Sequence, residues 1–152
     1  MYELEFILSI FVCKIYPCIQ PSHLLVPYID NYWEFKGNPD YGMRIHILPD
    51  GCTDFIFTLG EVANAVEEGS LIMQPYRSYF VGPMTKYSEL VTYTESIHMF
   101  GVRFLPCGLS CFTNLPLHEF VNSRVSTNEM KAVFDDTFIE KLGEQKHVTD
   151  RI

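Results

Sequence analysis

The sequence predicts a mainly β fold, an antiparallel sandwich or barrel followed by two or three short helices. Short apolar runs over 78–82, 88–93 and 97–104 are separated by turn residues, and such spacing without intervening helices is typical of antiparallel sheets. Helical spacing of apolar residues over several turns begins only after Pro106. We therefore expect the strands first and the helices last.

The segment before these strands predicts two further strands and a turn. The apolar run Phe6 to Cys13 is eight residues long and has no basic residue before it, so it resembles a buried strand more than a signal peptide or a membrane span. Ser22 can cap a short helical turn, which Pro27 interrupts. A strand is expected over 32–36.

The stretch from Met43 to Leu59 predicts a β hairpin. Pro49, Asp50 and Gly51 suit a three-residue loop that ends in a residue with positive φ. That loop would set His46 opposite Asp54 and give the hairpin two chemically different faces. The apolar face would carry Met43, Ile45, Ile47, Phe55, Phe57 and Leu59, and the polar face Arg44, His46, Cys52 and Asp54.

The C-terminal third predicts short helices. The first is expected over 109–114, and the pattern Ser126-Thr-Asn-Glu129 is a capping box that predicts another. Apolar residues then recur at i, i+4 and i+8 as Phe134, Phe138 and Leu142, before Gly143. Residues 144–152 are polar and are expected to begin a linker.

Composition limits the classes of function. The chain has 152 residues, 47% of them apolar, and a formal net charge of −8. One domain can therefore bury a core, and the acidic charge argues against this domain tracking a phosphate backbone. Five cysteines are an odd number, and a chain of this length can fold without disulfides. We therefore expect a reducing compartment, the cytoplasm.

One constellation has the ingredients of a nucleophilic site. In the predicted hairpin the Asp54 carboxylate could orient the His46 imidazole, which could activate the Cys52 thiol. Three polar residues on one face of a strand pair are more often the solvated side of a sheet. For metals the sequence offers one loose pair, Cys107 and Cys111, where zinc sites use two tight pairs, so we expect no metal and no cofactor.

Residues that could contact a ligand are the polar ones within predicted strands. Four are ranked first: Trp33, His46, Asp54 and His98. A histidine such as His98, on one strand face with Phe100, is also a candidate for a satisfied core residue. Arg103 falls on the opposite face, where an ion pair between elements is the expected role.

Five segments in order resemble the N-terminal sensor domain of AraC-type bacterial transcription regulators. They are Tyr28-Ile-Asp-Asn-Tyr-Trp33, Ile47-Leu-Pro-Asp-Gly-Cys-Thr-Asp-Phe-Ile-Phe57, Phe80-Val-Gly-Pro83, Gly101-Val-Arg-Phe-Leu-Pro106 and Leu115-Pro-Leu-His-Glu-Phe120. The Pro-Asp-Gly turn followed by Gly-Val-Arg-Phe is the most specific combination.

The resemblance implies a cupin-like or jelly-roll barrel over residues 1–143 that binds a small-molecule effector, of a kind the sequence does not name. It also implies a homodimer, with contacts through Phe134, Phe138 and Leu142. Residues 144–152 would lead to a helix-turn-helix domain that binds DNA and lies beyond this chain; no membrane is involved. Two alternatives stay open: a small cupin-like enzyme or metal-binding barrel using His46, Cys52 and Asp54, and a solidly packed oligomerisation domain.

Overall fold

The fold is described from a computed structural model, which places residues 13–15, 18–47, 49–60, 65–66, 73–93, 96–127, 141 and 144–145. Its strands are β1 (Cys13–Ile15), β2 (Ile29–Gly37), β3 (Met43–Ile47), β4 (Thr53–Thr58), β5 (Ala65–Val66), β6 (Ser78–Val81), β7 (Ser88–Thr92), β8 (Ile97–Phe104) and β9 (Arg124–Ser126). Two short 3₁₀ helices, η1 (Gly108–Cys111) and η2 (Leu117–Phe120), lie between β8 and β9. The prediction of a mainly β chain is confirmed.

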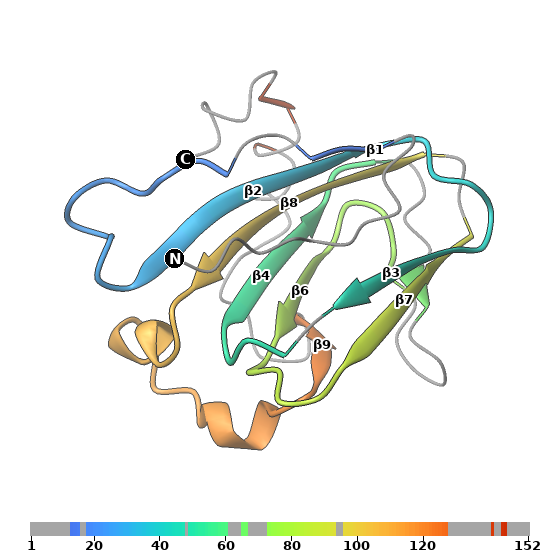
Figure 1. Cartoon of the computed structure of the whole chain (residues 1–152). Coiled ribbons are helices and arrows are strands. Elements are labelled where there is room, and N and C mark those ends of the chain that lie inside the picture. The colour runs from blue at the N-terminus through green and yellow to red at the C-terminus, as the bar shows by residue number, and fades with distance from the viewer. Residues whose placement is uncertain are drawn as a thin grey trace.

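The strands form two antiparallel sheets (Figure 1). The larger sheet has the order β1-β2-β8-β4-β6-β9, and the smaller one has the order β3-β7-β5. Within the described residues, no strand pairing joins the two sheets into a closed barrel. The structure therefore supports an antiparallel two-sheet arrangement, and the cupin-like barrel stays a prediction.

The predicted hairpin between β3 and β4 is wrong. β3 pairs with β7 in the small sheet, whereas β4 pairs with β6 and β8 in the large sheet. The turn at 49–52 therefore carries the chain from one sheet to the other, although Gly51 does adopt the expected positive φ of 71°. Every residue of β4 is buried, so this strand needs a neighbour along each edge and a cover on each face, which a solvated hairpin would not provide.

Each face of the large sheet carries its own hydrophobic cluster. The first, which we call the inner cluster, packs against Met43 of β3 and therefore lies toward the small sheet. It contains Phe35, Ile56, Met73, Tyr79, Val81, Met84, Ile97 and Met99. The outer cluster lies on the opposite face and contains Ile29, Tyr32, Phe55, Phe57, Leu59, Phe80, Phe100, Phe104 and Leu109. Successive side chains along β4 and β8 point to opposite faces of the sheet, so each of these strands contributes residues to both clusters.

The helical predictions are met only in part. The helix expected over 109–114 is the 3₁₀ turn η1, and the segment after Ser22 forms hydrogen-bonded turns up to Ile29. Ser126 is the last residue of β9, and Thr127, which follows it, is in a 3₁₀ helical conformation, as a helix beginning after Ser126 requires. The rest of that helix, the expected helix around Phe134 and most of the expected N-terminal strand lie outside the described residues.

Among the helices that the structure describes, none has the length and apolar character needed to cross a membrane.

Candidate functional site

A buried polar cluster lies beside the inner cluster, where β2, β8 and β4 run next to one another. Gly101 and Arg103 of β8 are the Cα partners of Trp33 and Asp54 on the two flanking strands. The Trp33 indole Nε1 donates a hydrogen bond to Asp54 Oδ1 at 3.0 Å. The predicted candidates Trp33 and Asp54 are thus brought together, by a strand inserted between them.

Arg103 completes this cluster by holding two carboxylates. Its Nε donates to Asp54 Oδ1 and its Nη2 to Asp54 Oδ2, both at 3.3 Å. Its Nη1 lies 2.9 Å from Asp50 Oδ2 in the turn at 49–52. We call Trp33, Asp50, Asp54 and Arg103 the arginine cluster. It joins three adjacent strands to the turn that connects the two sheets.

Gly101 makes room for this arrangement. A Cβ atom at residue 101 would overlap the Trp33 indole at Cε2, Cζ2 and Nε1. The indole therefore lies directly across the β8 backbone, where its Nε1 can reach Asp54. The glycine is required by this close approach, since any other side chain would displace the ring.

Electrostatics at the arginine cluster favour the charged guanidinium. Burial alone would lower the pKa of Arg103, but Asp54 and Asp50 outweigh it and raise that pKa. Asp54 is 7% exposed, and its burial raises its pKa, opposed by Arg103 and by the hydrogen bond from Trp33. The cluster is thus a buried ion pair whose charges are satisfied within the fold.

Cys52 lies in the same turn but is not an activated thiol. Its backbone N–H donates to Asp50 Oδ1 at 2.9 Å. Burial, followed by the negative charge of Asp50, raises the pKa of Cys52 to about 11. At neutral pH the residue is therefore a protonated thiol, whereas a nucleophile needs the thiolate.

His46 is not a strand partner of Asp54. It belongs to β3, where its Cα partner is Glu89 of β7, and Asp54 has the partners Val81 and Arg103. The register expected for the hairpin is wrong for this pair because the two strands lie in different sheets. The position of the His46 side chain lies outside the described residues.

His98 lies on the outer face of the large sheet, away from the arginine cluster. Its Nε2 is 2.6 Å from Glu34 Oε1, and the two side chains are 15% and 8% exposed. This is the arrangement of a satisfied buried histidine, the second role that the sequence allowed for this residue. The four ranked candidates therefore do not form one site.

The remaining candidates lie outside what the structure describes, or do not assemble. Phe134, Phe138 and Leu142, the predicted dimer contacts, are outside the described residues. Among the described residues, no group of three or more His, Cys, Asp or Glu is placed to hold a metal ion.

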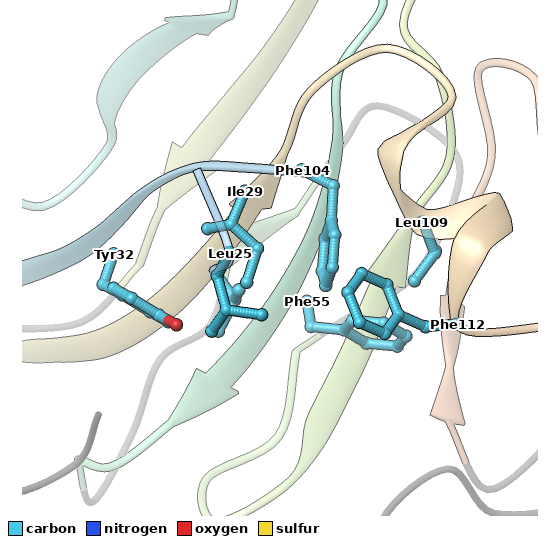
Figure 2. A pocket seen from close by; sticks show the side chains of 8 residues that line it. Leu25, Ile29, Tyr32, Phe55, Phe104, Leu109 and Phe112 are labelled. Atoms are coloured by element: carbon cyan, nitrogen blue, oxygen red, sulfur yellow. The ribbon is translucent and has the colours of Figure 1, made fainter. Parts of the chain in front are cut away.

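A cavity of about 300 Å³ opens on the outer face (Figure 2). Its floor comes from β2, β4 and β8. One wall comes from the turns before β2 and the first residue of that strand, and the other from η1 and the residue after it. Sequence reasoning did not find it, although the alternation of Phe100, Val102 and Phe104 marks the strand face that forms part of the floor.

Comparison with known proteins identifies a family. Residues 18–126 match the family described as a domain of unknown function, DUF6597. No curated protein and no solved structure matched the chain. All five segments noted in the sequence lie within the matched residues, as does the arginine cluster. Because the match spans most of the chain, this protein belongs to the DUF6597 family.

Proposed function

We propose that this chain is the regulatory domain of an AraC-type transcription regulator: it binds a small-molecule effector, forms a homodimer and catalyses no reaction. DNA binding belongs to a separate helix-turn-helix domain beyond this chain. The site of action is the bacterial cytoplasm. Free thiols at Cys18, Cys52, Cys107 and Cys111 are in keeping with a reducing compartment.

The observation that carries this proposal is the arginine cluster. Its four side chains come from three of the segments that resemble the AraC-type sensor domain: Trp33 from the first, Asp50 and Asp54 from the second, Arg103 from the fourth. Distant segments of one sequence pattern thus meet in one set of contacts. Because the segments that resemble the AraC-type sensor domain contact one another in this fold, the resemblance supports a similar architecture for this chain.

The same contacts favour a binding module over an enzyme. Asp54 is held by Arg103 and Trp33 within the core and is 7% exposed. Cys52 is a protonated thiol at neutral pH. The alternative of an enzyme built on His46, Cys52 and Asp54 depended on His46 lying opposite Asp54 in a hairpin, and the strands that carry these two residues are not paired. The cavity of about 300 Å³ argues against a solidly packed oligomerisation domain.

A thermal-shift screen tests the proposal. The chain is melted alone and with sugars, organic acids, neutral aromatic metabolites and divalent metals. A ligand that binds only the folded state raises the melting temperature by mass action, by about 2.7 kcal/mol of stability at one hundred times its Kd. We expect a saturable shift with an organic molecule, which mass spectrometry then recovers unchanged. Chemical conversion of that molecule would contradict a non-catalytic role, as would a shift with metal alone.

A further inference from the structure

The cavity on the outer face has walls that are fixed to each other. The Leu105 N–H donates to the Tyr28 carbonyl at 2.9 Å, and a Cβ at Gly108 would overlap that same carbonyl. The Tyr28 ring also meets the Phe112 ring edge-on at 5.3 Å. The turn before β2 and the helix η1 are therefore held together by close backbone contact, and the hollow between them is a built feature of the fold.

The lining is almost entirely hydrocarbon. Leu25 and Ile29 form one wall, Leu109 and Phe112 the other, and Phe55, Val102 and Phe104 lie on the floor. None of the described residues that line the cavity is charged. An ionised ligand would lose its hydration here without gaining a partner, at a cost of several kcal/mol. The chemistry of the lining thus selects a neutral molecule.

Among the described residues that line the cavity, one side chain supplies a polar atom. Tyr32 lines the cavity, and Figure 2 shows its hydroxyl directed toward the other lining side chains. Its ring stacks on Phe100, with centroids 6.4 Å apart, which fixes its direction. Burial raises the pKa of Tyr32, so the phenol is protonated at neutral pH. It can donate one hydrogen bond to an oxygen of a neutral ligand.

The size of the cavity limits the ligand. An apolar cavity of about 150 Å³ is known to hold benzene, so about 300 Å³ accommodates roughly twice that, two fused rings or an alkyl chain of similar volume. Phe112 at one wall is 53% exposed, so this side of the cavity borders the solvent.

We propose that this cavity binds a neutral, largely apolar molecule of about ten to fourteen non-hydrogen atoms, with one hydroxyl or carbonyl oxygen placed against the Tyr32 hydroxyl. This inference rests on the proposed function in taking that molecule as the effector class. The binding itself follows from the cavity. It also locates the site on the outer face, opposite the arginine cluster and away from the space between the two sheets.

The test uses 2-naphthol as probe and isothermal titration calorimetry on the whole chain. Naphthalene-2-carboxylate has the same rings with a charge, and we expect it to bind at least about tenfold more weakly because the lining cannot pair it. Val102→Phe places a larger side chain on the floor and should abolish binding of 2-naphthol. Tyr32→Phe keeps the ring and its stacking but removes the hydroxyl, and should weaken binding about three- to tenfold.

Tyr79→Phe is the matched control. Tyr79 lies on the inner face, where its hydroxyl accepts a hydrogen bond from the Gln74 N–H at 2.6 Å, so its loss should leave 2-naphthol binding unchanged. Because Tyr32→Phe changes no packing volume, it tests the site even where Val102→Phe fails to fold.

Each outcome decides something. The inference is overturned if 2-naphthol does not bind, or if both cavity variants bind it as tightly as the wild type. The proposed function would then depend on a thermal shift with another molecule. Equal binding of the carboxylate overturns the neutral class. If binding is weaker in both cavity variants and unchanged in Tyr79→Phe, the result supports ligand binding in the cavity. This holds even if the chain is found to be a monomer, which would contradict the proposed dimer.

Discussion

The bidentate contact between Asp54 and Arg103 is a largely buried ion pair that a single substitution can break. Asp54→Asn keeps the shape of the side chain but leaves the guanidinium, whose side chain is 18% exposed, with Asp50 as its charged partner in the cluster. Removal of one partner from a buried pair costs about 3 kcal/mol. We expect a loss of that order in the free energy of unfolding, measured by urea denaturation.

Asp50→Asn is the control for that measurement. The Asp50 side chain is 27% exposed, so solvent screens its contact with Arg103 and its loss should cost less than about 1 kcal/mol. Equal losses for the two variants would show that the buried pair does not determine stability.

Gly101 gives a second prediction at the scale of the residue. Gly101→Ala places a methyl group where the indole of Trp33 lies, so we expect the ring to move and its hydrogen bond to Asp54 to break, at a cost of roughly 1 to 3 kcal/mol for overpacking. Trp33 is the one tryptophan of the chain, so its fluorescence emission reports the displacement directly.

Trp33→Leu provides the background that tests the cause. In that background Gly101→Ala meets no indole and should cost much less, and a similar penalty in both backgrounds would assign the effect to the backbone of β8 instead.

The thiol of Cys52 gives a prediction that depends on pH. Burial and Asp50 raise its pKa from 9.0 to about 11, so at pH 8 it should react with iodoacetamide far more slowly than the exposed thiols of Cys107 and Cys111. Peptide mapping by mass spectrometry measures the three rates in one sample.

The same shift affects stability. Between pH 9 and about 11 the folded chain keeps the Cys52 proton that the unfolded chain has lost, so Cys52 makes stability fall as pH rises through that range. Cys52→Ala should remove this part of the loss. Rapid alkylation of Cys52 at pH 8 would contradict both expectations and revive the nucleophilic alternative.

At the scale of the residue, the sequence indicated the chemistry of Trp33, Asp54 and Arg103 but not their meeting. Arg103 was expected to form an ion pair between elements, and it does. Its partner Asp54 is 49 residues away, and the contact depends on β8 lying between β2 and β4. Local patterns specify the strands, whereas strand order depends on long-range packing that a single sequence does not display.

At the scale of the element, strong alternation and turn residues located the strands well. The strand expected over 97–104 has those bounds, and those expected over 78–82 and 88–93 differ from β6 and β7 by one residue at one end. The prediction of a hairpin was wrong because a Pro-Asp-Gly turn determines that the chain reverses direction but not which strand the next segment pairs with. In this fold the turn joins two sheets, since both faces of β4 are buried.

Disulfide cross-linking tests that assignment of β3. His46 and Glu89 are Cα partners on β3 and β7, so cysteines introduced at both positions should form a disulfide on mild oxidation, with the bridge mapped by mass spectrometry. The matched pair joins Ile47 to Thr53, which are directly opposite in the hairpin alternative but belong to different sheets in this fold. A bridge in the second pair and none in the first would restore the hairpin.

At the scale of the whole molecule, the proposed role is that of a domain that binds a small ligand and leaves DNA to another domain. The net charge of −8 gives little attraction for phosphates. The two faces of the large sheet have different chemistry: the inner face carries the arginine cluster, and the outer face carries the apolar cavity. The contacts of the inner face hold the strands together, and the outer face carries the cavity that could hold a ligand.

The remaining whole-molecule property is association. The spacing of Phe134, Phe138 and Leu142 predicts one apolar stripe on a helix. If this stripe packs against a second copy of the chain, a charged side chain within it would be buried without a partner, which destabilises the contact. We expect Phe138→Asp to convert the proposed dimer to a monomer in sedimentation velocity at micromolar concentration. Thr137→Asp adds the same charge about 100° around the helix and should leave the dimer intact. A wild-type chain that sediments as a monomer, or a dimer that both variants preserve, would show that this stripe serves another contact.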